Sequence, residues 1–188
     1  MYYIILLVLV ASVSATPCPK VTAVKDFKFA SFAKGTWYQV ARYPNVFENR
    51  GECGTTVYTT KNDVTDVTNR YVIKHQEFTV QGTARLADNA GDSGIVIHSF
   101  PYGAHGEFKD YESYILAIDY TEYCICYYCK YNESSAVHES FGWIYSRNNV
   151  LSTQAKKAVD KFLNETSLLE ADKFIWPKFT AEACRVEN

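Results

Sequence analysis

Short segments in which apolar and polar residues alternate fill the chain from Trp37 to Arg147. In residues 65–73, for example, one face of a strand would carry Val67, Asn69, Tyr71 and Ile73. Period-two segments separated by Gly, Asn and Asp are typical of antiparallel strands and their turns. With residues 53–61 included, the pattern predicts eight strands, which are joined by short turns and by a polar loop over residues 103–110.

The period changes after the last strand, where Ser152 can cap an amphipathic helix. The apolar positions that recur at three- and four-residue steps are Ala155, Ala158, Val159, Phe162 and Leu163. Strands followed by one helix favour an all-β fold over a βαβ fold, which would interleave the two element types. We therefore expect an eight-stranded antiparallel up-and-down barrel with one C-terminal α-helix packed outside. Such a barrel encloses room for one small ligand.

The N-terminal end of the chain is an apolar run that closes with Val13, Ser14 and Ala15, residues of the kind that precede a signal peptidase cleavage site. The run is too short to cross a bilayer as a helix. We expect residues 1–15 to be a signal peptide and residues 16–188 to form one domain. The mature protein would be secreted into an extracellular fluid, without membrane insertion.

Six cysteines in a secreted chain indicate disulfides. Cys18 begins the mature chain and Cys184 lies near its end, so each is placed to tie a chain end to the body of the fold. Removing such a bridge typically costs about 2–5 kcal/mol. The residues alone leave the partners open among Cys53, Cys124, Cys126 and Cys129.

Charge and motifs argue against nucleic-acid binding and against catalysis. The formal net charge is -2, and no block of Lys and Arg forms the basic face that a nucleic acid requires. Gly91-Asp92-Ser93-Gly94 resembles the nucleophile tetrapeptide of trypsin-like proteases, but the chain is too short for that double barrel. The four histidines are scattered, without metal-ligand spacing. We predict no enzyme, no catalytic cofactor and no metal site.

Three short motifs resemble the signatures of the lipocalin family, in the order in which lipocalins carry them. Gly35-Thr36-Trp37 precedes the first predicted strand, Asp119-Tyr120 lies between the sixth and seventh, and Arg147 follows the eighth. Ile118 stands where lipocalins commonly have Thr. The resemblance implies that Arg147 packs over Trp37 at a closed end of the barrel, a cation–π contact worth about 1–2 kcal/mol when desolvated.

A narrower resemblance, to the insect bilin-binding proteins and insecticyanins, covers nearly the whole mature chain. It rests on the stretches CPKVTAVKDF, GTWYQVARYPN, GECG, YYCKY, SRNNVLS and ADKFIWPKFTAEAC. Those proteins are blue lipocalins that hold a biliverdin. The resemblance therefore implies a carrier of one non-covalently bound bilin, for coloration or for pigment storage and transport in haemolymph. It also implies the disulfides Cys18–Cys129 and Cys53–Cys184.

The same resemblance implies the ligand-binding residues. The wall would be formed by Asn69, Tyr71, Val80, Phe100, Tyr102, Tyr111, Tyr128 and Phe141, and the loop over the mouth would contribute Asn45, Val46 and Phe47. Lys109 and Lys130 would pair with the two propionates of the bilin. The alternative for each Lys is a solvated strand end. The alternative for each Tyr is ordinary core or outer surface, since 15 Tyr and 11 Phe also suit a core or an interface.

Cys124 and Cys126 depart from the pattern of those pigment proteins. Two residues apart in a strand, they share the face opposite to Cys129, and such neighbours are poorly placed to bridge each other. If Tyr128 and Lys130 face the barrel interior, Cys124 and Cys126 do so too. The simpler expectation is that they are small packing residues near the closed end. The alternatives are that a thiol contacts the tetrapyrrole or adds to it, or that the two cysteines take part in an unexpected disulfide or bind a metal.

Two sequons, Asn132-Glu133-Ser134 and Asn164-Glu165-Thr166, are expected to be exposed in a hairpin turn and after the helix.

Alternative functions stay open, because the barrel provides the container while a few wall residues determine which ligand binds. The cargo could be a carotenoid, retinoid, fatty acid or odorant, or the mouth could engage a protein or a small amine. Exposed aromatic residues would support a homo-oligomer, although no stretch requires one.

Overall fold

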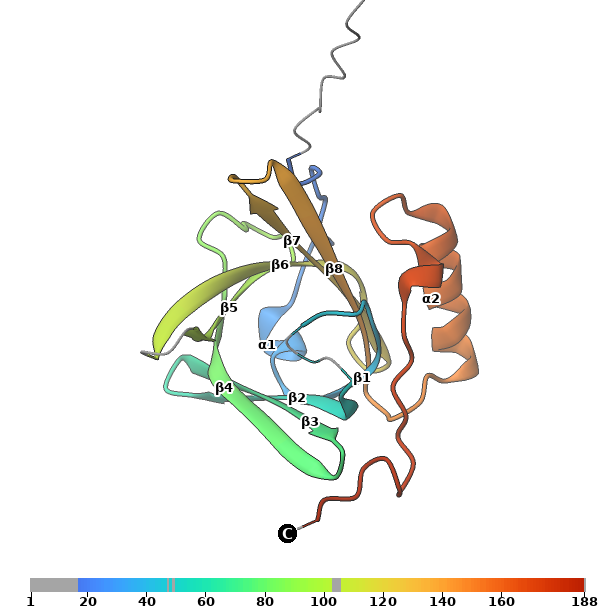
Figure 1. Ribbon diagram of the computed structural model, residues 1–188. Coiled ribbons are helices and arrows are strands. Elements are labelled where there is room, and N and C mark those ends of the chain that lie inside the picture. The colour runs from blue at the N-terminus through green and yellow to red at the C-terminus, as the bar shows by residue number, and fades with distance from the viewer. Residues whose placement is uncertain (1–16, 47, 49, 103–105, 188) are drawn as a thin grey trace, which may run out of the picture.

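The computed structural model describes residues 17–187 except 47, 49 and 103–105, so the predicted signal peptide lies outside the described residues. Eight antiparallel strands pair in sequence order, and the last pairs with the first, which closes the sheet into a barrel (Figure 1). The strands are β1 Gly35–Arg42, β2 Glu52–Lys61, β3 Val64–Ile73, β4 Gln76–Leu86, β5 Ile95–Tyr102, β6 Glu107–Asp119, β7 Tyr123–Asn132 and β8 Val137–Ser146. The predicted up-and-down barrel is confirmed.

Turn chemistry sets the boundary between β3 and β4. Between β3 and β4, Lys74 and His75 both have positive φ, 49° and 64°, which is the backbone conformation that a two-residue hairpin turn needs to match strand twist.

The predicted polar loop over residues 103–110 is wrong in its second half, because residues 107–110 belong to β6 and pair with β5. Their polar composition hid the alternation, which continues through Lys109 on the same face as Tyr111.

The closed end of the barrel is filled by a cluster of buried side chains around Trp37, which is 1% exposed. A short helix, α1 Phe29–Phe32, lies across this end (Figure 1), and Trp37 Nε1 donates to the carbonyl oxygen of Phe32 at 2.9 Å. The Arg147 guanidinium carbon lies 3.5 Å from the centre of the Trp37 ring. The same guanidinium donates to the carbonyl oxygens of Lys34 and Thr36.

A second core lies outside the barrel, between the sheet and helix α2 Thr153–Glu165. The helix begins after Ser152, whose hydroxyl accepts from the backbone N–H of Ala155 at 3.1 Å. Its buried positions are Ala155, Val159 and Leu163, and they pack on the outer face of β1, β7 and β8 (Figure 1). The helix therefore covers the outside of the wall and leaves the barrel interior free.

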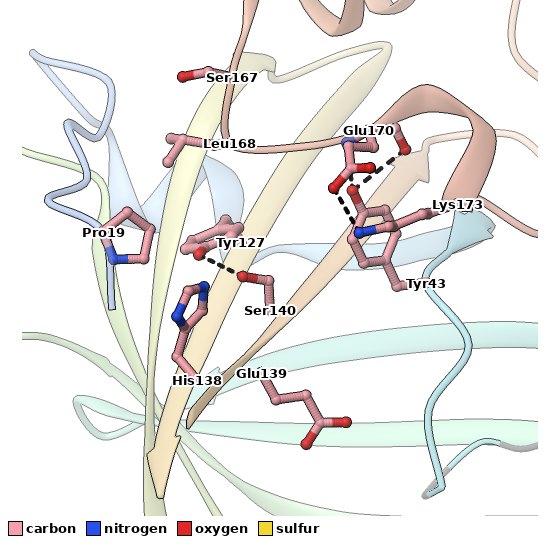
Figure 2. Close-up of a pocket in the computed structure, with 10 residues that line it drawn as sticks. All are labelled: Pro19, Tyr43, Tyr127, His138, Glu139, Ser140, Ser167, Leu168, Glu170 and Lys173. Atoms are coloured by element: carbon pink, nitrogen blue, oxygen red, sulfur yellow. Dashed lines mark hydrogen bonds and ion pairs between the residues drawn. The ribbon is translucent and has the colours of Figure 1, made fainter. Parts of the chain in front are cut away.

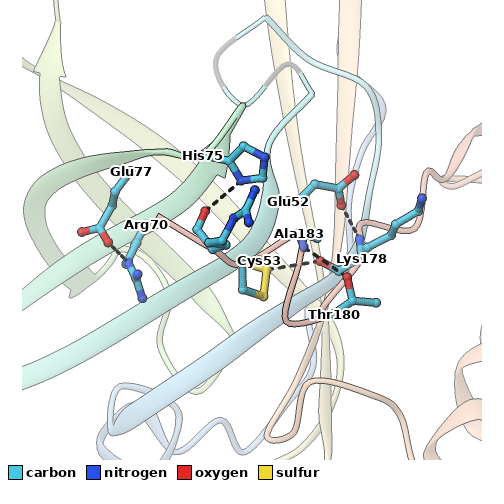
Figure 3. The surroundings of a disulfide bond; sticks show 10 residues. Glu52, Cys53, Arg70, His75, Glu77, Lys178, Thr180 and Ala183 are labelled. Atoms are coloured by element: carbon cyan, nitrogen blue, oxygen red, sulfur yellow. Dashed lines mark hydrogen bonds and ion pairs between the residues drawn. A yellow bond between two sulfur atoms is a disulfide. The ribbon is translucent and has the colours of Figure 1, made fainter. Parts of the chain in front are cut away.

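Two disulfides tie the ends of the chain to the wall, and they are the pairs Cys18–Cys129 and Cys53–Cys184 that the resemblance implies. After the 3-10 turn η1 Ala171–Lys173, the C-terminal segment pairs with β1 through Arg42 and Ile175. Figure 3 shows how the segment then reaches Cys53, whose N–H donates to the carbonyl oxygen of Lys178 at 3.2 Å. The tail is thus fixed to the sheet by backbone pairing as well as by the bridge.

Candidate functional site

The inner surface of the barrel changes from buried to accessible along the barrel axis. At the closed end, Val67, Val96 and Ile115 are at most 1% exposed. Further along β5 and β6, Phe100 and Tyr111 are only half-buried. Alternate residues of a strand share one face, so these side chains belong to the same inner surface. The barrel is therefore filled at one end and accessible from the other, which we call the mouth.

Most of the predicted wall residues lie on this inner surface. Asn69 pairs with Val80 across β3 and β4, and Tyr71 stacks on Phe78 with ring centroids 5.7 Å apart. A chain of neighbouring rings, with centroids 5.5 to 6.4 Å apart, crosses β5 to β8 through Phe100, Tyr111, Tyr128, Phe141 and Trp143. Tyr102 is half exposed at the rim. The wall is thus largely aromatic, as a flat conjugated ligand requires.

Of the residues predicted in the loop over the mouth, Asn45 contacts a neighbour that faces the barrel. Its side chain donates to Glu48 Oε2 at 2.6 Å and accepts from the Glu48 N–H at 2.9 Å. Val46 is 86% exposed and points to solvent, while Phe47 lies outside the described residues.

The sequence analysis missed a charged network inside the wall. The Glu48 carboxylate accepts from Trp143 Nε1 at 3.1 Å and from the Gln39 amide, and it lies 3.7 Å from Arg42 Nε. Arg42 is 1% exposed, and it donates to Gln39 Oε1 at 3.0 Å and to the Gly51 carbonyl oxygen at 2.8 Å. A buried charge is tolerated when it is paired and hydrogen-bonded. Burial raises the pKa of Tyr71, and the nearby Glu48 carboxylate raises it further.

The two predicted propionate partners differ in their surroundings. Lys109 is half-buried, and its Nζ lies 4.9 Å from the Tyr102 ring centre and 5.8 Å from that of Tyr111. These cation–π contacts hold the ammonium against the aromatic wall near the mouth. Lys130 is exposed near the end of β7, where it pairs in register with Glu139. Lys109 is therefore the better fixed of the two cations.

A second set of polar side chains on the inner surface was also missed. The Tyr58 hydroxyl lies 2.8 Å from His98 Nε2, and His98 Nδ1 lies 3.3 Å from Ser113 Oγ. Burial lowers the pKa of His98 to about 4, so the imidazole is neutral at physiological pH. The alternation itself could have found these residues, because His98 stands two positions before Phe100 and Ser113 two positions after Tyr111.

Cys124 and Cys126 are free and buried on the inner surface, with their sulfur atoms 3.5 Å apart. They belong to the cluster that fills the closed end, together with Trp37 and Tyr58. Burial raises the pKa of the Cys124 thiol, which keeps it protonated and a poor nucleophile. This surrounding agrees with the simpler expectation, that the two residues are packing residues.

A hollow of about 520 Å³ lies on the outside of the barrel, between β7, β8 and residues 167–173 (Figure 2). On its walls, the Tyr127 hydroxyl lies 2.9 Å from Ser140 Oγ, and the Tyr43 hydroxyl contacts the backbone of Glu170. The hollow contains none of the predicted ligand-binding residues. It is thus separate from the inner surface.

Both sequon asparagines are exposed. Asn132 was predicted in the hairpin turn, but it is the last residue of β7 and pairs with Val137, so only the rest of its sequon lies in the turn. Asn164 lies in the last turn of α2, so its predicted position after the helix is wrong by two residues, because the helix continues to Glu165. Within the described part of the chain, no helix has the length and apolar character to cross a membrane.

Comparison with known proteins agrees with this architecture. Residues 34–178 match the model of the lipocalin / cytosolic fatty-acid binding protein family. Over its full length the chain is 37% identical to the bilin-binding protein of Pieris brassicae, also over that protein's full length. It is 32% identical to insecticyanin-B of Manduca sexta, with 89% of this chain and 82% of the relative covered. The solved structure of insecticyanin from that species superimposes with a TM-score of 0.84 at 31% identity, covering 90% of each chain. The chain therefore belongs to the lipocalin family.

Proposed function

We propose that this lipocalin is a secreted carrier of one bilin, most simply biliverdin, held non-covalently inside the barrel. The observation that carries the proposal is the accessible aromatic inner surface between the mouth and the floor of Trp37 and Arg147. A tetrapyrrole needs wide apolar walls for its conjugated rings and cations for its propionates. The aromatic rings of β5 to β8 supply the walls, and Lys109 supplies a cation at the rim.

The relatives support the same cargo. The protein of Pieris brassicae is named for bilin binding, and its similarity extends over the whole of both chains. A role in coloration or in pigment storage and transport in an extracellular fluid follows from that cargo. The proposal also includes glycosylation at Asn132 and Asn164 and assembly into a homo-oligomer. A loss of mass on glycosidase treatment would test the first, and the molecular mass of the purified protein in solution would test the second.

The direct test is reconstitution with pigment. The mature chain, expressed with its disulfides and purified without ligand, is titrated with biliverdin while absorption and tryptophan fluorescence are recorded. We expect a long-wavelength absorption band that saturates at one equivalent, and quenching of tryptophan emission because Trp143 lies on the inner surface. Protein that develops no such band would reject the bilin. Saturable binding of a retinoid or a fatty acid instead would identify a different hydrophobic cargo.

A further inference from the structure

Three polar residues from three strands form one hydrogen-bonded chain across the inner surface. Tyr58 of β2, His98 of β5 and Ser113 of β6 are linked by contacts of 2.8 Å and 3.3 Å. They lie between the filled floor and the aromatic wall, since Val96 below His98 is fully buried and Phe100 above it is half-buried. Ser113 is itself only half-buried.

The direction of the hydrogen bonds in this chain follows from the buried end. Tyr58 is 6% exposed, and within the described residues its hydroxyl has only His98 as a hydrogen-bond partner. A buried hydroxyl without an acceptor for its proton is costly, so Tyr58 donates to His98 Nε2. Burial also lowers the pKa of His98, so the ring carries a single N–H. That proton must then be on Nδ1, and His98 donates it to Ser113 Oγ.

As a consequence, the hydroxyl proton of Ser113 is available to donate to a ligand. Ser113 Oγ accepts from His98, so its own O–H is oriented away from the imidazole. Within the described part of the chain, His98 is the one hydrogen-bond partner of this hydroxyl. Because Ser113 is on the accessible part of the inner surface, its proton is presented to whatever fills the barrel.

We propose that Ser113 is a specificity-determining residue that donates a hydrogen bond to a carbonyl oxygen at the deep edge of the ligand, and that His98 and Tyr58 position this donor. The inference rests on the proposed function and makes it more specific: for a bilin, the acceptor is a lactam carbonyl of a terminal ring. A pure hydrocarbon would leave the donor desolvated and unpaired, so the site selects against it.

The position of Ser113 on β6 fits the shape of a bilin. Ser113, Tyr111 and Lys109 are successive inward residues, and four residues of antiparallel strand span about 14 Å. In the IXα isomer of biliverdin, coiled like a porphyrin, the lactam carbonyls lie on one edge and the propionates on the opposite edge. With the carbonyls at Ser113 and the propionates near Lys109, the flat ring system lies against Tyr111, between the two polar anchors.

The experiment compares biliverdin bound to the wild type with biliverdin bound to Ser113→Ala. Affinity is measured by titration, and the lactam C=O stretching band of the bound pigment is measured by Raman or infrared difference spectroscopy. We expect about tenfold weaker binding, the value of one hydrogen bond, and a shift of the C=O band to higher frequency. Tyr58→Phe should move the band in the same direction, because His98 can then accept from Ser113 instead of donating to it.

Ser99→Ala is the matched control, since Ser99 follows His98 on β5 but bonds to Asp110 on the outer surface. It should change neither the affinity nor the band. Circular dichroism and thermal melting establish that each variant is folded. An unchanged C=O band and affinity in Ser113→Ala would overturn the inference and leave the bilin carrier standing. A wild type that binds no biliverdin would instead overturn the proposed function, and the lactam contact with it.

Discussion

The Arg147 guanidinium lies over Trp37, with its central carbon 3.5 Å from the ring centre, while its nitrogens donate to carbonyl oxygens of Ser31, Lys34, Thr36 and Tyr120. One side chain therefore joins the N-terminal segment, the start of β1 and the β6–β7 turn. A planar guanidinium can do this because its donors point outward in the plane while its face stays on the ring.

Replacing Arg147 by Met should lower the free energy of unfolding by about 2–4 kcal/mol, the sum of a cation–π contact and several charge-assisted hydrogen bonds. Chemical denaturation followed by tryptophan fluorescence measures the loss. Arg147→Lys keeps the charge but not the planar set of donors, so it should recover only a small part. Equal midpoints for the wild type and the Met variant would contradict this role.

Removing both mouth cations should affect only charged cargo. In the double variant Lys109→Met and Lys130→Met, we expect biliverdin to bind about tenfold more weakly, because two partly exposed ion pairs are lost. Biliverdin dimethyl ester should bind both proteins equally. Lys61→Met, at the opposite end of the barrel, is the control. Equal losses for acid and ester would mean that the lysines act through packing and not through charge.

Stability should fall in mild acid because of His98. Its pKa is lowered to about 4 from 6.5, so between these values the unfolded chain binds the proton more readily than the folded chain. Stability is therefore nearly constant above about pH 7 and declines as the pH falls towards 4, by roughly 2–3 kcal/mol at pH 4.5. Denaturation of ligand-free wild type and His98→Gln at pH 7 and 4.5 isolates this contribution. A decline of the same size in both proteins would assign it to other groups.

The bridge Cys53–Cys184 should stabilise the barrel and hold the C-terminal tail. Replacing both cysteines by Ser should cost about 2–5 kcal/mol. Hydrogen exchange should also accelerate at position 53 and at Ile175, whose backbone N–H groups bond across the tail and the sheet. Exchange in α2 should change less, since the helix has its own buried contacts. A tail that stays protected after the substitution would show that backbone pairing alone suffices to hold it.

The pigment should leave Cys124 and Cys126 unmodified. Both thiols are buried on the floor, where the rise in the pKa of Cys124 disfavours the nucleophilic thiolate. We expect pigment-loaded protein, denatured without reductant, to show the mass of the polypeptide alone and to take up two equivalents of an alkylating reagent. A mass increased by one tetrapyrrole on the peptide that contains these residues would contradict this expectation.

The alternation of the sequence predicted the faces of the strands well, and it failed where the backbone shifts register. Trp37 and Gln39 face inward, and simple alternation would then turn Arg42 outward. The irregularity between Gln39 and Ala41 changes the phase, so Arg42 pairs with inward-facing Trp143 and becomes buried. Its partner Glu48 comes from the loop that follows β1, and no local pattern could bring a loop carboxylate onto a strand guanidinium.

The hydrogen-bonded chain of Tyr58, His98 and Ser113 was overlooked for a different reason. Each residue has the alternation of an inward position, but they come from β2, β5 and β6, and their meeting depends on closure of the whole sheet. The disulfide pairs and the contact of Arg147 with Trp37 were reached through family resemblance. The paired cysteines are separated by 111 and 131 residues, and a local sequence pattern cannot predict which residues meet over such a distance.

The sealed floor has a kinetic consequence. With Trp37 and Arg147 closing one end, cargo enters and leaves by the same route, so it cannot be passed through the protein from one side to the other. The residence time of the pigment is then governed at the rim, where Lys109 and Tyr102 stand. Any acceptor must approach that rim to receive the cargo. A molecule that covers the rim with equal affinity for the empty and the loaded protein will slow loading and release to the same degree, while the equilibrium constant stays unchanged.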